Sequence, residues 1–270
     1  MKLRHNPYRV FRSSKTPAGL YARQKWLGES GSPLWQADFQ ETCTALLADQ
    51  SPDGSWQHDP YATITRLFGL HLTIRASSLQ IEAALNWLLG MLDMQSFEIK
   101  DHSVSAATGA DLKGLPFTPS RPALLLTGAA LFLATIFGRD DDSNVLLIYR
   151  HLRAAGLKNR GHWHDTASSH NIFRALVVHP TFAKDGVTAS AVARLADLQT
   201  DAGGWRENLP FYQTLNALAH LKSPQANRQL ERAFERLLRS QNSDGTWSRI
   251  DPEWNTFLAV HALRNKGLLE

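Results

Sequence analysis

Apolar residues recur at spacings of three and four along most of the chain, which predicts a protein built from helices. The charged segment 227–239 carries one apolar stripe, which includes Leu230, Phe234 and Leu237, as expected of a helix that buries a single face. Five other runs are apolar around more of their circumference and are expected to lie further inside: residues 61–73, 122–137, 171–178, 212–221 and 254–263. Strand-like alternation is absent, so the fold class is predicted to be all-α.

A short motif recurs between these helical segments: glutamine, three residues, glycine, one residue, tryptophan. The three full copies end at Trp56, Trp205 and Trp247, and a degenerate copy with leucine in place of glutamine ends at Trp163. Trp163 and Trp205 lie 42 residues apart, as do Trp205 and Trp247. Such self-similarity is typical of repeat architectures. A further, more degenerate copy of the motif is expected between Trp56 and Trp163, at residues 87–95.

The motif residues have physical roles in a turn. Glycine supplies the positive φ that ends a helix tightly, the indole offers an apolar plate with one N–H donor, and glutamine can bond backbone groups freed at helix ends. Each unit is therefore predicted to be an outer helix, a turn and an inner helix, with the turns stapling neighbouring hairpins. Five to six hairpins that close on themselves give an α/α toroid, and an open solenoid is the alternative.

Placed between helices at these intervals, the Gln-x-x-x-Gly-x-Trp turns resemble the repeats of squalene and oxidosqualene cyclases and of protein prenyltransferase β subunits. The resemblance covers roughly residues 35–270. It implies a toroid with an apolar, isoprenoid-like small molecule in its central cavity. It also suggests a protein partner, because the prenyltransferase β subunit works beside a second chain.

The catalytic signatures of that family are incomplete here. Of the Asp-x-Asp-Asp-Thr motif with which class II cyclases protonate their substrate, only Asp59 is matched. The prenyltransferase zinc ligands need a cysteine, and Cys43 lies before the first Trp turn. The acidic run 140–142 could suggest a Mg²⁺–diphosphate site, but its place before a helical segment favours capping. An enzyme of cyclase, transferase or lyase type and a non-catalytic binding module both remain open.

Histidines supply a second candidate for chemistry. His162, His164, Asp165 and His170 surround one Trp turn. The three imidazoles could hold Zn²⁺ with an open position, or His164 or His170 could act as a general base oriented by Asp165; ordinary polar turn chemistry is the third interpretation. A further set recurs at one repeat position and is interpreted as architectural: His71, His179, His220 and His261.

Polar and aromatic residues on the inner helices are predicted to face the cavity and bind substrate: Tyr61, Arg66, Arg121, Arg174, Tyr212, Asn216, Trp254 and Asn255. Arg66 and Arg174 suit an anion, since a guanidinium binds carboxylate, sulfate or diphosphate in bidentate fashion. The Gly- and Pro-bearing segment 99–122 is predicted to be an insertion loop that acts as a lid.

Charge and composition limit the remaining choices. Residues 1–34 hold seven Lys or Arg against one acid, which predicts a basic N-terminal arm before a toroid domain at 35–270. No nucleic-acid motif accompanies that charge, so a solvated arm is favoured over nucleic-acid binding. The single cysteine allows no intramolecular disulfide, and no apolar run reaches the roughly 18 residues of a spanning helix. The sequence predicts a soluble, cytoplasmic protein.

Overall fold

The chain folds into helices throughout the part that the computed structural model describes, residues 3–92 and 104–269. Within these residues no strand is present, and the all-α prediction is confirmed. The α-helices are α1 (Pro17–Lys25), α2 (Pro33–Leu47), α3 (Pro60–Thr73), α4 (Leu79–Gly90), α5 (Pro122–Ile136), α6 (Ser143–Lys158), α7 (Thr166–Val178), α8 (Gly186–Leu198), α9 (Phe211–Ala219), α10 (Pro224–Arg239) and α11 (Pro252–Asn265). The last residue of the more degenerate copy expected at residues 87–95, Gln95, and the start of the predicted insertion, 99–103, lie outside the described residues.

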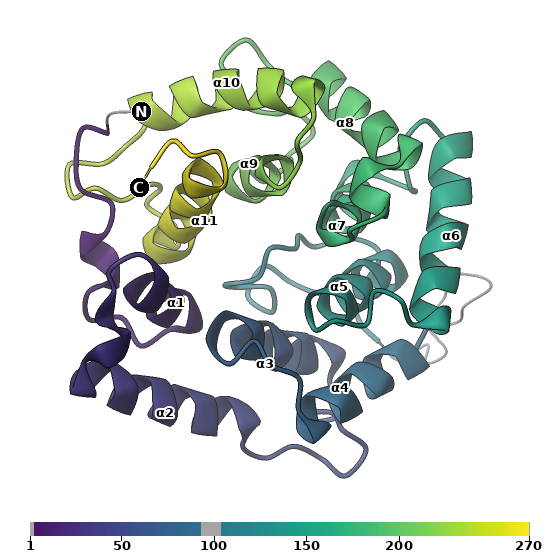
Figure 1. The fold of residues 1–270 in the computed structure, drawn as a ribbon. Helices are drawn as coiled ribbons and strands as arrows, with labels where there is room; N and C mark the ends of the chain where they lie inside the picture. The colour runs from purple at the N-terminus through teal and green to yellow at the C-terminus, as the bar shows by residue number, and fades with distance from the viewer. Residues whose placement is uncertain (1–2, 93–103, 270) are drawn as a thin grey trace.

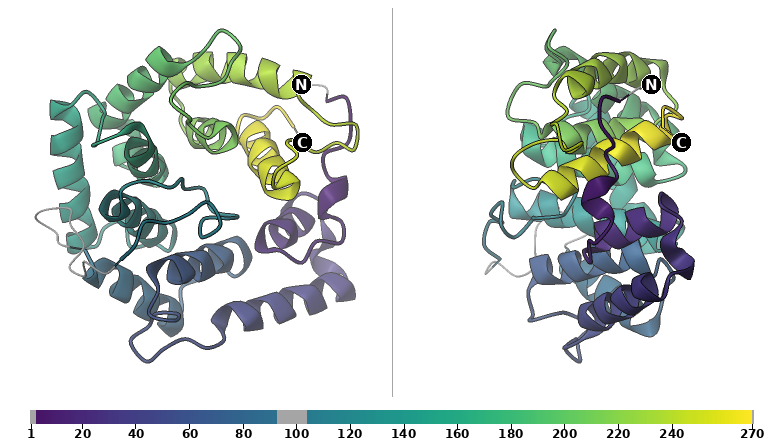
Figure 2. Two further views of the ribbon diagram at one scale, coloured as in Figure 1. Left: turned by 180° about the vertical axis from the view of Figure 1, so that it is seen from behind. Right: turned by 90° about the vertical axis from the view of Figure 1, so that its left-hand side faces the viewer.

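The helices form two layers that alternate along the chain. Helices α2, α4, α6, α8 and α10 lie at the periphery, and the odd-numbered helices lie inside them (Figure 1; Figure 2 shows the layers from behind and from the side). Helix α5 is buried on all sides, continuously from Ala123 to Thr135. In α10, by contrast, only one face is buried. These are the inner and outer roles that the apolar patterns predicted.

The turns that end at Trp56 and Trp205 are hydrogen-bonded to the next peripheral helix. Gln199 donates from Nε2 to the carbonyl oxygen of Gln229 in α10 (2.8 Å), and Gln50 makes the same bond to Gln80 in α4 (2.8 Å). The indole N–H of Trp56 donates back to the carbonyl of Ala48 at the end of α2 (2.8 Å). The predicted stapling of neighbouring hairpins is confirmed at these two turns, since each glutamine bonds to the backbone of the helix that follows.

Glycine is required at these turns for space as well as conformation. Gly203 has φ +83°, and a Cβ there would overlap the carbonyl oxygen of Arg232 in α10. Because the turn lies directly on the backbone of the next helix, any side chain would push the two apart.

The last Trp turn contacts the N-terminal segment instead of a helix. Gln241 Nε2 donates to the His5 carbonyl (3.0 Å) and Gln241 Oε1 accepts from the His5 N–H (3.1 Å). A Cβ on Gly245 would meet the Asn6 carbonyl oxygen. Residues 5 and 6 therefore take the place that a peripheral helix takes beside the other turns, and they connect the two ends of the chain.

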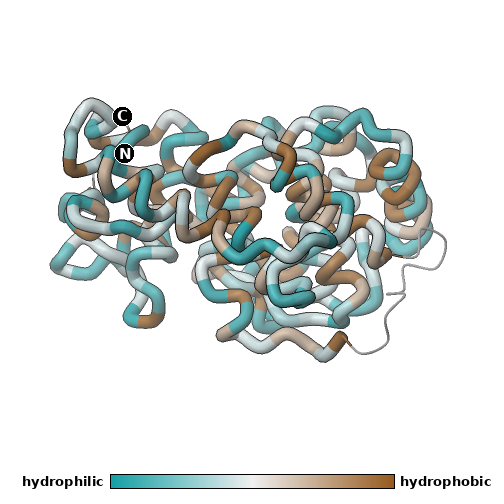
Figure 3. The backbone as a smooth tube through the Cα atoms, turned by 90° about the horizontal axis from the view of Figure 1, so that it is seen from below, coloured by the Kyte–Doolittle hydropathy of each residue, from teal (hydrophilic) through white to brown (hydrophobic). Residues whose placement is uncertain are grey.

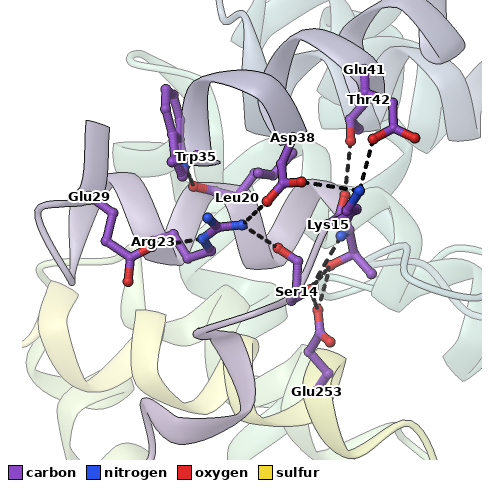
Figure 4. A network of polar contacts seen from close by, with 11 residues as sticks. Ser14, Lys15, Leu20, Arg23, Glu29, Trp35, Asp38, Glu41, Thr42 and Glu253 are labelled. Carbon is purple, nitrogen blue, oxygen red and sulfur yellow. Dashed lines mark hydrogen bonds and ion pairs between the residues drawn. The ribbon is translucent and has the colours of Figure 1, made fainter. Parts of the chain in front are cut away.

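The predicted basic arm, 1–34, contains α1, and this helix is part of the inner layer. Arg23 is almost completely buried and binds Asp38 of α2 (2.7 Å) and Glu29 (2.8 Å) (Figure 4). Hydrogen bonds from Arg23 and then Lys15 lower the pKa of Asp38. On the other side, Ser14 donates to Glu253 of α11 (2.7 Å). The arm is thus fixed between the first peripheral helix and the last inner one.

Two further predictions concern the acidic run 140–142 and the lack of a membrane-spanning helix. Asp142 caps α6, since its carboxylate accepts from the N–H groups of Asn144 (2.8 Å) and Val145 (3.3 Å), and the capping interpretation of the acidic run is confirmed. Figure 3 shows hydrophobic and hydrophilic stretches interspersed along the described backbone. Among the described residues, no helix has the length and apolar character needed to cross a bilayer.

Replacing Gly203 by alanine tests whether the turn depends on contact with the next helix. We expect Gly203→Ala to lower the free energy of unfolding in urea by about 3 kcal/mol, because positive φ and a backbone overlap add. Gly267→Ala is the matched control: Gly267 also has positive φ (+65°) but open space around it, so a loss of about 1 kcal/mol is expected there. Equal losses in the two variants would contradict the contact.

Candidate functional site

Three residues predicted to bind substrate meet in one interior cavity. Arg174 of α7, Asn216 of α9 and Trp254 of α11 line a space of about 280 Å³. The remaining wall is mainly aromatic, imidazole and aliphatic, and includes Tyr21, Phe68, His71, Arg75, Phe132, His220, Phe257 and His261. We refer to this space as the central cavity. Its polar residues lie in the C-terminal halves of the inner helices or directly after them.

A chain of hydrogen bonds crosses the cavity wall. Arg174 Nη1 donates to Asn216 Oδ1 (3.0 Å). This fixes the amide so that Asn216 Nδ2 faces His261 Nδ1 (3.1 Å) and the Leu258 carbonyl (3.3 Å). Because the amide nitrogen can only donate, His261 Nδ1 must accept, and a neutral His261 then carries its proton on Nε2. One buried amide thereby sets both the guanidinium position and the imidazole tautomer.

Arg174 is a buried cation without a counterion in the described chain. Its side chain is 3% exposed, its Nε has no hydrogen-bond partner, and no carboxylate of the described residues forms an ion pair with it. Burial lowers its pKa to about 9. The guanidinium lies 5.5 Å from the centre of the Phe132 ring. An unpaired buried charge is costly, so this position favours binding of an anion.

A second guanidinium, which the sequence analysis did not select, lines the same cavity. Arg75 follows the C-terminus of α3 and stacks 4.2 Å above the Tyr21 ring. Its Nη2 is buried and without a partner among the described residues. Arg66, which was predicted for this role, points away from the cavity and bonds to the Ala45 carbonyl of α2. Of the predicted pair Arg66 and Arg174, only Arg174 lines the central cavity, and Arg75 is the second guanidinium there.

The recurrent histidines separate into two groups. His179 is structural, since its Nε2 bonds to the Asp140 carbonyl (3.1 Å) and its Nδ1 accepts from the Thr181 N–H (3.1 Å). His71, His220 and His261 instead line the central cavity, so the architectural interpretation was too broad. Burial, reinforced by Arg75, lowers the pKa of His71 to about 4. Burial followed by the Arg174 charge lowers the pKa of His261 to about 4, and both rings are neutral at pH 7.

The cluster predicted around Trp163 is not assembled as a metal or catalytic site. His164 is half exposed and its Nε2 lies 3.8 Å from Asp165, whereas His170 is 2% exposed and neither of its ring nitrogens has a hydrogen-bond partner in the described part of the chain. Asp165 caps α7 by accepting from the Ser168 N–H (2.6 Å). Across the described ranges, no three His, Cys, Asp or Glu side chains are grouped so that they could hold a metal ion. The predicted set His162, His164 and His170 therefore does not converge.

The other predicted residues serve the ends of inner helices. Asp59 caps α3 by accepting from the Tyr61 N–H (2.7 Å), and the Tyr61 hydroxyl donates to the Ser105 carbonyl (2.8 Å). Asn255 donates to the Ile250 carbonyl (2.7 Å). Arg121 is exposed at the N-cap of α5, and Tyr212 packs edge-on to its neighbour Phe211. None of these lines the central cavity.

The described part of the insertion, 104–121, closes one side of the cavity. Asn171 of α7 holds it through both amide atoms, with Nδ2 donating to the Thr118 carbonyl (2.8 Å) and Oδ1 accepting from the Thr118 N–H (2.9 Å). Phe117 packs edge-on to Phe132 (5.6 Å) and Pro116 lines the cavity. Figure 1 shows the segment reaching into the space that the inner helices enclose.

Comparison with known proteins supports the fold alone. No protein-family model matches the chain, and no curated protein matches it. Among solved structures, a protein from Actinoplanes has a similar fold, with a TM-score of 0.59 at 17% sequence identity. The alignment covers 94% of this chain and 89% of the Actinoplanes protein.

The neutral cavity histidines predict a pH dependence of stability. Because the pKa of His71 is about 4 in the folded chain and ordinary in the unfolded chain, the unfolded state binds protons first as pH falls. Stability is retained above about pH 6.5 and declines toward pH 4. We expect His71→Gln to remove about 2 kcal/mol of the decline between pH 7 and pH 5, measured by urea unfolding. An NMR titration giving His71 a pKa near 6.5 would contradict the burial argument.

Proposed function

We propose that this chain is an α/α toroid of the prenyltransferase and squalene-cyclase repeat type, and that its central cavity binds a small molecule with an apolar body and an anionic group. The alternating helix layers, the stapled Trp turns and the connection between the last turn and His5 support a closed ring over an open solenoid. An aromatic-walled interior cavity with few polar groups is the usual form of a ligand site.

The observation that carries the proposal is the unpaired Arg174 guanidinium. Asn216 orients it, Phe132 covers one side of it, and no carboxylate of the described chain neutralises it. Arg75 adds a second positive group on the same wall. An anionic ligand would replace the missing counterion through charge-assisted hydrogen bonds, while Phe68, Trp254 and Phe257 would contact its apolar body.

The residues present suit binding better than substrate protonation. No Asp or Glu lines the central cavity among the described residues, so a squalene-type protonation step has no acid there. His71 is neutral, and its buried Nδ1, which has no partner among the described residues, can form a hydrogen bond with a ligand. The sequence left two alternatives open, an enzyme and a non-catalytic binding module, and both would bind a ligand in this cavity. A metal-dependent enzyme built on His162, His164 and His170 is not proposed.

Ligand binding by an Arg174 variant tests the proposal. We expect geranyl diphosphate to stabilise the protein against heat and its neutral alcohol geraniol to have much less effect. Arg174→Gln should weaken diphosphate binding at least tenfold, because a hydrogen bond to a charged group contributes about 1.5–3 kcal/mol. Arg121→Gln is the matched control, since Arg121 is exposed outside the cavity. Equal binding by the two variants would overturn the assignment of Arg174.

A further inference from the structure

A second, larger cavity adjoins the central one. It has a volume of about 520 Å³ and lies between α1, α3 and α11, with Ala18, Thr65, Gly69, Leu115, Pro252 and Trp254 among its walls. We call it the side chamber. Phe68, Leu72 and Trp254 line both spaces, so the two cavities share these three side chains as a common wall.

The charges of the side chamber are already engaged, unlike those of the central cavity. Lys113 and Asp251 lie 3.5 Å apart as an ion pair at its wall. Glu253 accepts hydrogen bonds from Ser14 and Thr16. The rest of the lining is mainly apolar. The one cation among the described lining residues, Lys113, is paired with Asp251, so an anion would find no free counterion there and the space suits an apolar group.

Trp254 at the junction is a further sign of a ligand. Its side chain is 8% exposed, and its indole N–H has no acceptor among the described residues. The ring stacks on Phe257 (5.4 Å between centroids) and meets Phe68 edge-on (5.8 Å). A buried indole N–H usually has a partner, and the anionic head of a ligand in the central cavity, which Trp254 also lines, would supply an acceptor.

We infer that the two cavities form one bipartite site for a single-chain amphiphile. The anionic head would bind Arg174 and Arg75 in the central cavity, and the apolar chain would pass Phe68 and Trp254 into the side chamber. This inference rests on the proposed anion site and adds the placement and selection of the chain. Residues 113–115 of the insertion then form a wall of the chain-binding part, which gives this segment a role in specificity.

Chain length tests the inference. Binding of octanoate and dodecanoate is measured by calorimetry below their micelle concentrations, with geranyl and farnesyl phosphate as a branched pair. We expect the longer member of at least one pair to bind at least tenfold more tightly, since each buried methylene raises affinity about threefold to fourfold. The pair that shows the gain identifies a straight or an isoprenoid chain. Similar affinities within both pairs would overturn the inference.

Two variants separate this inference from the proposed function. Thr65 is exposed on an inner helix and lines the side chamber, so Thr65→Phe fills space without disturbing packed core. We expect Thr65→Phe to bind the longer ligand of a pair less than threefold more tightly than the shorter one, with the affinity for the shorter ligand unchanged. Thr65→Ser should resemble the unmodified protein. An unchanged gain in Thr65→Phe would refute the side-chamber placement. Arg174→Gln should weaken every ligand, and its failure to do so would instead refute the anion site.

Discussion

The contact between each Trp turn and the next peripheral helix is the constraint on which the rest of the structure depends. A turn such as Gly203–Trp205 lies on the backbone of α10 so closely that only glycine fits, and Gln199 bonds the same helix. Each hairpin is therefore positioned by its successor rather than by its own residues. The last turn has no helix to follow it, and the segment at His5 and Asn6 completes the series.

This arrangement forces the inner helices to share one interior. Most of that interior is apolar, but Arg174, Asn216 and His261 project into it from three helices that are far apart in sequence. Burying a guanidinium without a counterion is unfavourable, and the free energy of apolar burial elsewhere, for instance all along α5, offsets it. A chain that retains such a group where a neutral one would be cheaper has a site suited to anions.

Some residues of this site were predicted from the sequence and others were not. Arg174, Asn216 and Trp254 were predicted because they are polar or amphipathic residues on apolar helices. Arg66 met the same criterion, but its position on α3 turns it toward α2. Arg75 lies beyond the helix end, where a residue has no helical periodicity to reveal its direction. His71 and His261 carried a visible signal, their shared repeat position, which equally fits structural histidines such as His179.

The sequence by itself determined the helices, their inner or outer burial and the turns between them, because these depend on local periodicity and on the special conformations of glycine. It also determined that α6 begins at an acidic cap, since a cap acts within one helical turn. Only the tertiary structure decided which polar residues meet. Convergence depends on helix rotation and on contacts between helices far apart in sequence, which is why His162, His164 and His170 form no metal-binding group within the described residues while Arg174 reaches Asn216.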